Sequence, residues 1–319
     1  MAKLCQDLCI LKTSGIDLLL TYVHIVMKNK NERNKMKLKT ILMAAAFTLT
    51  AGNSIAQDRF AKVQMQVQPL GGSVHMMVGS GGNIGVSAGT DGILLVDDQY
   101  APLAEKISSA LGDLGSNGPK YIINTHYHGD HTGSNAFFSS KASSTVFAHE
   151  NVRIRLASGE DADPAALPVV TYQDGIKFHF NDETIHVLHL PSGHTDGDSI
   201  VWFEQPDVLH TGDLFFKNWF PYIDLGAGGD VVGYIASVTQ MLDMISDTTK
   251  IIPGHGSLAT KADLVKFRDM IAETYEYVQA LKVAGQSEDD IVAMGLEDKW
   301  DSWAWQFITE ERWIRTLYK

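Results

Sequence analysis

From residue 62 onward, the pattern of apolar and polar positions predicts short strands followed by helices. Apolar residues alternate or cluster as in strands over 62–68, 73–78, 83–87 and 93–96. The Gly-rich run 79–82 predicts a hairpin turn, because it lacks the spacing of a dinucleotide-binding loop and no helix follows it. A helix is expected over 101–111, and a short buried strand over 121–124.

Beyond residue 124, strands and helices alternate. The pattern predicts helices over 132–138, 149–156, 231–245 and 260–282, with Gly285 as the stop of the last one. Strands are expected over 145–148, 176–180, 184–190, 199–203, 208–210 and 250–252. Mixed strands followed by helices occur twice. We therefore expect an α/β fold of four layers, in which two sheets face each other and helices cover their outer faces.

The first 56 residues have the composition of a leader rather than of a folded domain. Residues 36–56 begin with lysines, continue with an apolar run over 41–49 and end in Ser54-Ile55-Ala56, which is the layout of a secretory signal peptide. The apolar run is too short for a membrane span. A buried N-terminal helix is the less favoured alternative for this run. Residues 1–35 fit the layout poorly, and a start codon placed too far upstream accounts for them better than an N-terminal anchor. We expect a periplasmic or secreted protein without stable membrane association, and interpret 57–319 as a single domain that ends in a helical, Trp-rich tail.

The charge distribution bears on the choice of partner. Residues 1–56 carry eight Lys and Arg against three Asp and Glu, whereas the remaining 263 residues have a net charge of −17. An acidic body repels a polyphosphate backbone, so we expect a small-molecule substrate and no nucleic acid. Both cysteines, Cys5 and Cys9, lie in the leader, so the mature chain contains no disulfide.

One segment carries the chemistry. His126, His128, Asp130 and His131 fall within six residues directly after a predicted strand. Imidazole and carboxylate are the zinc ligands expected at a catalytic site. Four ligands cannot complete two metal sites, and three further candidates stand in Gly-flanked turns after predicted strands: His194, Asp213 and His255.

These residues, in this order, resemble the metallo-β-lactamase superfamily. The resemblance implies an αβ/βα sandwich with metals between the sheets. It also implies that His126, His128 and His194 hold one zinc, that Asp130, His131 and His255 hold a second, and that Asp213 bridges them. Iron or manganese are the other metals that such a site accepts.

The same resemblance implies a hydrolase in which a metal-bridging hydroxide attacks a carbonyl carbon. Asp130 is the expected catalytic residue, which orients the hydroxide and relays its proton. Tyr127, Lys217 and Asn218 are expected to contact the substrate because they lie near these ligands in the sequence.

Asp213 directs the choice of substrate. Antibiotic-degrading relatives place a cysteine in this turn, whereas an aspartate with His131 is similar to the glyoxalase II and lactonase type of site. We therefore expect an ester, a lactone or a thioester as substrate. Two alternatives remain open: a periplasmic metallo-β-lactamase, and a non-hydrolytic metal-binding accessory or redox protein.

Overall fold

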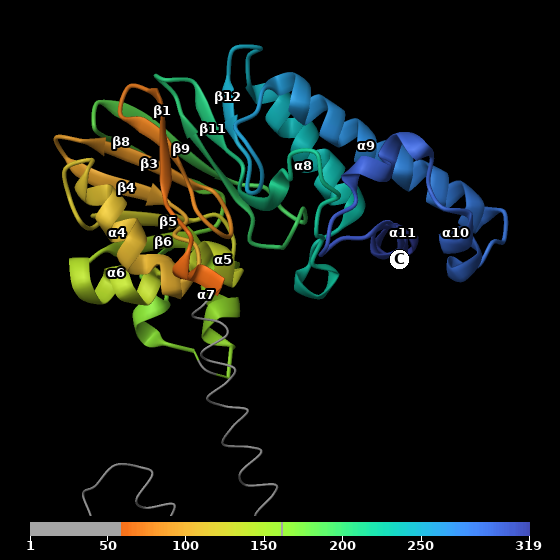
Figure 1. The fold of residues 1–319 in the computed structure, drawn as a ribbon, viewed down its shortest axis with the longest axis horizontal. Coiled ribbons are helices and arrows are strands. Elements are labelled where there is room, and N and C mark those ends of the chain that lie inside the picture. Colours follow the sequence, from red (N-terminus) through yellow and green to blue (C-terminus); the bar gives the residue numbers. More distant parts are fainter. Residues whose placement is uncertain (1–58, 161) are drawn as a thin grey trace, which may run out of the picture. The chain divides into compact units, whose positions relative to one another are not determined.

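The strands form two sheets. The computed structural model describes residues 59–160 and 162–319 (Figure 1). The seven strands of the first sheet lie in sequence order: β1 (Gln66–Gly71), β2 (Val74–Val78), β3 (Ile84–Gly89), β4 (Gly92–Val96), β5 (Tyr121–Asn124), β6 (Thr145–His149) and β7 (Val170–Tyr172). Strands β1 to β4 pair antiparallel, and β4 to β7 pair parallel.

The second sheet has five strands in the order β12 (Lys250–Ile252), β11 (Val208–His210), β10 (Ser199–Phe203), β9 (Glu183–His189) and β8 (Gly175–Phe180). Only the pair of β11 and β12 in this sheet is parallel. Strand β12 therefore ends at the same edge as β11, which places the turns after both strands side by side.

Helices cover the outer faces of both sheets (Figure 1). Those of the first half are α4 (Ala104–Gly112), α5 (Gly129–Thr132), α6 (Asn135–Ala142) and α7 (Glu150–Ala157). Those of the second half are α8 (Val231–Met244), α9 (Lys261–Val283), α10 (Glu288–Met294) and α11 (Glu310–Tyr318). The 3₁₀ turns are η1 (Ala101–Leu103), η2 (Pro164–Ala166), η3 (Gly212–Leu214), η4 (Leu225–Ala227) and η5 (Asp298–Trp303).

Alternation along the strands explains the layers. In β4, Leu94 and Val96 pack into the core between the sheets, where they meet Val201 of the opposite sheet. Ile93 and Leu95 point the other way and pack against helix residues such as Ile107. Side chains of a strand alternate between its two faces, so one short strand supplies two cores. The α/β sandwich expected from the sequence is confirmed.

The Trp-rich tail packs against the second half. Trp313 in α11 is fully buried, its indole N–H donates to Thr274 Oγ1 in α9 at 3.1 Å, and its ring stacks on Phe220 at 5.5 Å. No helix among residues 59–160 and 162–319 is long and apolar enough to cross a membrane. The expected signal peptide lies outside the described residues.

Candidate metal centre

Strand ends of both sheets bring the seven candidate ligands together. His126 and His128 follow β5, and Asp130 and His131 lie in the single turn of α5. From the second sheet come His194 before β10, Asp213 in η3 after β11 and His255 after β12. All seven side chains that the sequence singled out lie in two adjacent clusters.

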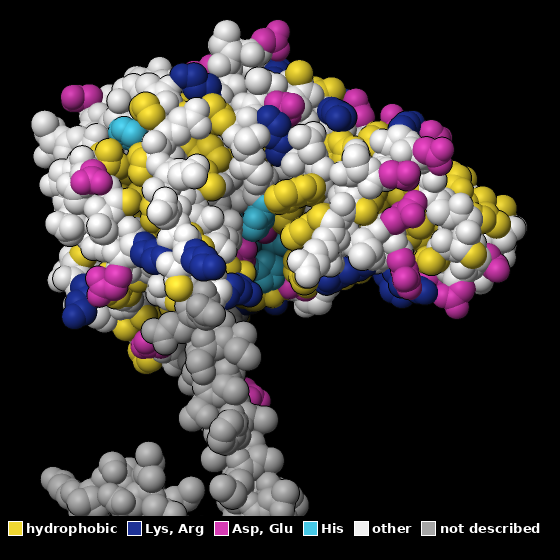
Figure 2. Space-filling model, in the orientation of Figure 1, with side chains coloured by type: hydrophobic (Ala, Val, Ile, Leu, Met, Phe, Trp, Pro, Cys, Tyr) yellow, Lys and Arg dark blue, Asp and Glu magenta, His cyan; other side chains and the backbone are white. Residues whose placement is uncertain are grey.

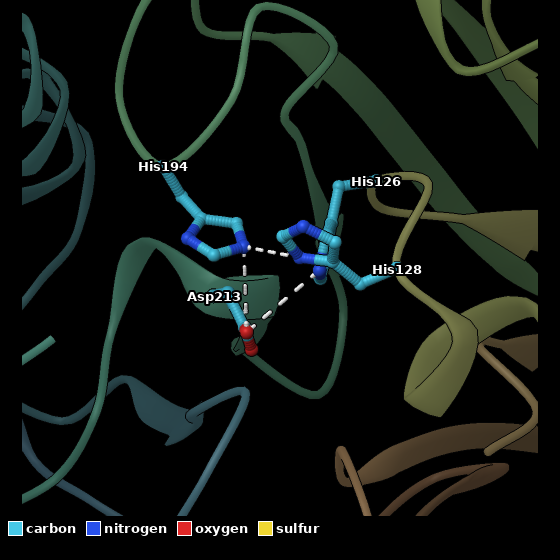
Figure 3. A group of neighbouring side chains, drawn as sticks. All are labelled: His126, His128, His194 and Asp213. Carbon is cyan, nitrogen blue, oxygen red and sulfur yellow. Dashed lines mark hydrogen bonds and ion pairs between the residues drawn. The ribbon is translucent and has the colours of Figure 1, made fainter. Parts of the chain in front are cut away.

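The first cluster consists of His126, His128, His194 and Asp213 (Figure 3). Its potential ligand atoms all lie within 4.8 Å of one another. His194 Nε2 is 2.8 Å from His128 Nδ1 and 3.6 Å from Asp213 Oδ2, which in turn is 3.7 Å from His126 Nε2. The four groups surround one point, as ligands of a single ion do.

The second cluster consists of Asp130, His131 and His255. Asp130 Oδ2 lies 3.4 Å from His255 Nε2 and 3.7 Å from His131 Nε2. The other oxygen of Asp213, Oδ1, lies 3.1 Å from His131 Nε2 and 3.3 Å from His255 Nε2. One carboxylate thus faces both clusters, with one oxygen directed to each.

The donor atoms fit a metal. His126 Nε2, His131 Nε2 and Asp213 Oδ1 are fully buried and have no hydrogen-bond partner. A buried polar atom without a partner costs about 1–3 kcal/mol, so such atoms are rare unless a ligand or ion satisfies them. Three of them here point into the two clusters, and their chemistry is that of zinc ligands.

The outward-facing ring nitrogens are held by hydrogen bonds. His131 Nδ1 donates to Asp97 Oδ2 at 2.7 Å, and His194 Nδ1 donates to the Tyr222 carbonyl at 2.7 Å. Asp97 also accepts the backbone N–H and the hydroxyl of Thr125, at 2.7 and 2.8 Å. These bonds fix the orientation of each ring, and in the neutral imidazole they select the tautomer whose other nitrogen presents its lone pair to the cluster.

His128 is oriented differently from the other histidines. It presents Nδ1 to the first cluster, while its Nε2 lies 3.1 Å from Asp224 Oδ2. The same oxygen accepts the hydroxyl of Tyr127 at 2.6 Å. Asp224 immediately precedes η4 and therefore connects this loop to the segment that carries the first ligands.

The protonation preferences differ between the clusters. Burial lowers the pKa of His126, and burial lowers the pKa of His194 to about 4. Burial also opposes charge on His255, but the carboxylates of Asp213 and Asp130 raise its pKa to about 9. In Asp213 the cost of burial is outweighed by the neighbouring imidazoles, His131 foremost, and its pKa falls well below the usual range. His126 and His194 are therefore neutral near pH 7, whereas His255 is charged.

Two glycines allow the backbone to approach the ligands closely. A Cβ at Gly82 would lie 2.1 Å from His131 Cε1, and one at Gly254 would lie 2.1 Å from Asp213 Oδ1. Residues 79–82 form the predicted turn between β2 and β3. The turn also packs on the second cluster.

The three residues expected to contact substrate take up different positions. The hydroxyl of Tyr127 donates a hydrogen bond to Asp224, and the centroid of the Tyr127 ring lies 4.4 Å from that of the His128 ring. The Lys217 amine donates to the Leu258 carbonyl at 2.8 Å and pairs with Asp263 at 3.2 Å, so its charge is matched at the start of α9. Asn218 is exposed, with φ 62°. Substrate contact by these residues stays a prediction.

Sequence reasoning missed the residues that hold the ligands. Asp97 and Asp224 lie far along the chain from the histidines that they contact. Asp97 is 34 positions from His131, and Asp224 is 96 positions from His128. The one available signal was the position of Asp97 at the end of a buried strand, where functional groups of α/β proteins gather.

Known proteins are similar to this chain in sequence. A family model described as the metallo-beta-lactamase superfamily matches residues 79–255. The hydroxyacylglutathione hydrolase of Nitrosococcus oceani is 32% identical over 135 residues, which cover 42% of this chain and 47% of that protein. The hydroxyacylglutathione hydrolase of Methylococcus capsulatus is 31% identical over 129 residues, or 40% of this chain and 44% of that protein. The chain thus spans about half the length of these two enzymes.

The fold has solved counterparts. A metallo-beta-lactamase from Pontibacter korlensis superposes with a TM-score of 0.56 at 18% identity, covering 66% of this chain and 99% of that one. The family match extends over more than half of the chain and includes every residue of the two clusters. The chain therefore belongs to the metallo-beta-lactamase superfamily.

Proposed function

We propose that this protein is a hydrolase of carboxylic esters, lactones or thioesters, and that its seven clustered residues hold two zinc ions. The observation that carries the proposal is the placement of Asp213. Its two oxygens face different clusters at 3.1–3.7 Å from four imidazole nitrogens. This is the disposition expected of a carboxylate that bridges two metals.

The nature of the ligands favours zinc and a hydrolytic reaction. Imidazole and carboxylate donors suit zinc, although iron and manganese accept the same set. Zinc at such a site acts as a Lewis acid and makes water acidic enough to serve as a nucleophile near neutral pH.

Asp130 is the proposed proton carrier. Burial opposes its charge, but His131 and His255 outweigh this effect and lower its pKa. The carboxylate is therefore ionised at neutral pH and can accept a proton. The Asp130 side chain is 20% exposed. Asp130, His128 and His255 are the three of the seven candidate ligands that are most accessible to a substrate.

Two observations support ester or thioester chemistry. The ligand at position 213 is an aspartate, not the cysteine of antibiotic-degrading relatives. The relatives from Nitrosococcus oceani and Methylococcus capsulatus are named for hydrolysis of a hydroxyacylglutathione, which is a thioester.

The test is a hydrolysis screen with zinc-supplied protein over thioesters, lactones, β-lactams and phosphodiesters. We expect turnover of thioesters or lactones and little turnover of a carbapenem. Asp130→Asn should lower kcat by at least about 100-fold, the usual contribution of a positioned proton acceptor. Asp113→Asn, at an exposed carboxylate at the end of α4, should leave kcat unchanged.

The possible outcomes separate the alternatives. Efficient carbapenem turnover with no thioester turnover would establish a β-lactamase instead. Absence of turnover in every class, with metal bound, would favour the non-hydrolytic role.

A further inference from the structure

A continuous row of aromatic rings runs along one side of the metal centre. We call this row the aromatic wall and define it as Phe216, Trp219, Tyr222, Trp305 and Phe307. It begins at the second cluster, where Phe216 stacks on His255 with ring centroids 4.9 Å apart. It ends at the first cluster, where Tyr222 lies 5.7 Å from the rings of His128 and His194.

The intervening contacts are continuous. Centroid distances are 6.3 Å from Phe216 to Trp305, 5.6 Å from Trp305 to Phe307 and 5.4 Å from Phe307 to Tyr222. Trp219 stacks on Trp305 at 5.3 Å. The row therefore joins His255 of the second cluster to His128 and His194 of the first through direct ring contacts.

The wall is accessible from solvent. Phe307 is 48% exposed, Trp219, Tyr222 and Trp305 are half-buried, and Phe216 forms a buried backing. Figure 2 shows histidine side chains at the bottom of a hollow, with hydrophobic side chains beside them. Exposed aromatic surface next to a catalytic centre is typical of a ligand-binding groove.

The wall is also held rigidly. The Trp305 indole N–H donates to the Phe220 carbonyl at 2.9 Å, and the Phe220 N–H donates to the Trp303 carbonyl at 2.9 Å. These bonds tie the tail to the loop that follows Asp213. A preformed surface binds without the entropic cost of ordering its own side chains.

A cation lies beside two rings of the wall. The Arg312 guanidinium is 4.2 Å from the Phe307 ring and 5.1 Å from the Tyr222 ring, and it donates to the Phe307 carbonyl at 2.9 Å. Within residues 59–160 and 162–319, no carboxylate forms an ion pair with Arg312. The positive charge disfavours a cationic substituent here.

We propose that the aromatic wall is the subsite for the acyl group of the substrate, and that it selects an aromatic or extended apolar acyl group that is neutral or anionic. This inference rests on the proposed function for the position of the scissile carbonyl. It goes beyond that function by assigning the substrate class to residues of the C-terminal tail.

The first experiment compares two thioesters with the same small leaving group, the S-methyl thioesters of acetic acid and of phenylacetic acid. We expect the wild-type kcat/KM to be at least about tenfold higher for the phenylacetyl substrate, since burying such a group contributes on that order. Phe307→Ala should remove most of this preference and leave the acetyl substrate within about twofold. Tyr277→Ala, at an exposed aromatic on α9, should change neither value.

The second experiment measures binding without turnover. Phenylacetate and acetate are titrated into the zinc-loaded protein by calorimetry, with the same variants. We expect phenylacetate to bind at least about tenfold more tightly and Phe307→Ala to abolish the difference. Phe307→Leu keeps an apolar side chain and serves if the alanine variant unfolds; it should retain part of the preference.

The two experiments fail in different ways. If the wild-type protein hydrolyses no ester, lactone or thioester but still binds phenylacetate more tightly than acetate, the proposed function is refuted and the wall remains a binding surface for an aromatic group. Equal binding of phenylacetate and acetate to the wild-type protein would overturn the wall inference, whatever the protein hydrolyses. An equal effect of Phe307→Ala on both thioesters would also overturn it.

Discussion

At the scale of single residues, Asp97 shows how a hydrogen bond orients the imidazole of His131. It follows β4 with φ 65°, is fully buried, and accepts one bond from His131 and two from Thr125. The left-handed backbone is one that asparagine also tolerates. Asp97→Asn is therefore a test of the charge, with little added backbone strain.

We predict that Asp97→Asn weakens zinc binding at the second cluster by about 10–100-fold, the usual effect of losing a partner of a ligating histidine. Competition with a chromophoric chelator measures this affinity. Asp113→Asn is the matched control. Unchanged zinc affinity in the Asp97 variant would show that the Asp97 carboxylate does not strengthen metal binding by His131.

A second prediction concerns protons. His255 in the metal-free protein has a pKa of about 9, and the pKa of His131 is raised by Asp213 and Asp130 against the opposing effect of burial. His255 is therefore protonated at pH 7.5, the surroundings of His131 favour its protonated form, and metal binding must displace these protons. Calorimetry of zinc binding in buffers of different ionisation enthalpy should show a net release of protons. Binding without release would contradict these assignments.

The same shift has a consequence for stability. Because the pKa of His255 is raised in the folded state, the protonated form of His255 stabilises the metal-free fold. This stabilisation is fully present below the unfolded pKa of 6.5 and is lost as the pH rises through about 9. The Tm of the metal-free protein should fall over this range, and His255→Gln should flatten the fall. A Tm that rises between pH 6.5 and 9 would contradict the sign of the effect.

The residues that could be found from the sequence are those that cluster locally or stand in Gly-flanked turns. His126, His128, Asp130 and His131 are such a group. Asp224 and Tyr222 could not be found, because their contacts with His128 and His194 join segments more than 25 residues apart. Nothing in the local sequence marks such pairs.

At the scale of elements, most strands were predicted. Strands β5, β11 and β12 have the predicted bounds, whereas β7, which follows the predicted loop over 158–168, was missed. Helix α6 begins at Asn135, after the separate turn α5, and not at the predicted residue 132. The tail was expected to pack on the body, as Trp313 does. The contacts of Trp305 with Phe216 and of Phe307 with Tyr222 depend on tertiary packing.

The tail provides the prediction at this scale. Trp313→Ala removes a fully buried ring, its stack on Phe220 and its bond to Thr274, at a cost of about 3–5 kcal/mol. The Tm should fall by about 10 °C. Trp313→Phe keeps most of the packing and should cost less. Equal stability of the alanine variant and the wild type would show that α11 does not stabilise the fold.

At the scale of the whole molecule, the repeated order of strands and helices was enough to predict the layers. It could not give the order β12-β11-β10-β9-β8, in which the parallel pair brings Asp213 and His255 together. Register and neighbour choice depend on long-range pairing, which a periodic pattern does not encode.

The leader leads to a prediction about the mature chain. If residues 36–56 form a signal peptide, the exported protein begins at Gln57. Mass spectrometry of the protein secreted by a bacterial host measures this terminus. Recovery of the chain with residues 36–56 still attached would refute cleavage.

The central claim is that seven side chains hold two zinc ions through a shared Asp213, and the metal content of the reconstituted protein tests it most directly. Elemental analysis after zinc loading and removal of free metal should give about two zinc ions per chain, falling to about one or fewer in Asp213→Ala, in which both clusters lose an oxygen ligand. A saturated wild-type protein with one zinc ion or none, or an Asp213→Ala variant that still binds two, would contradict the account.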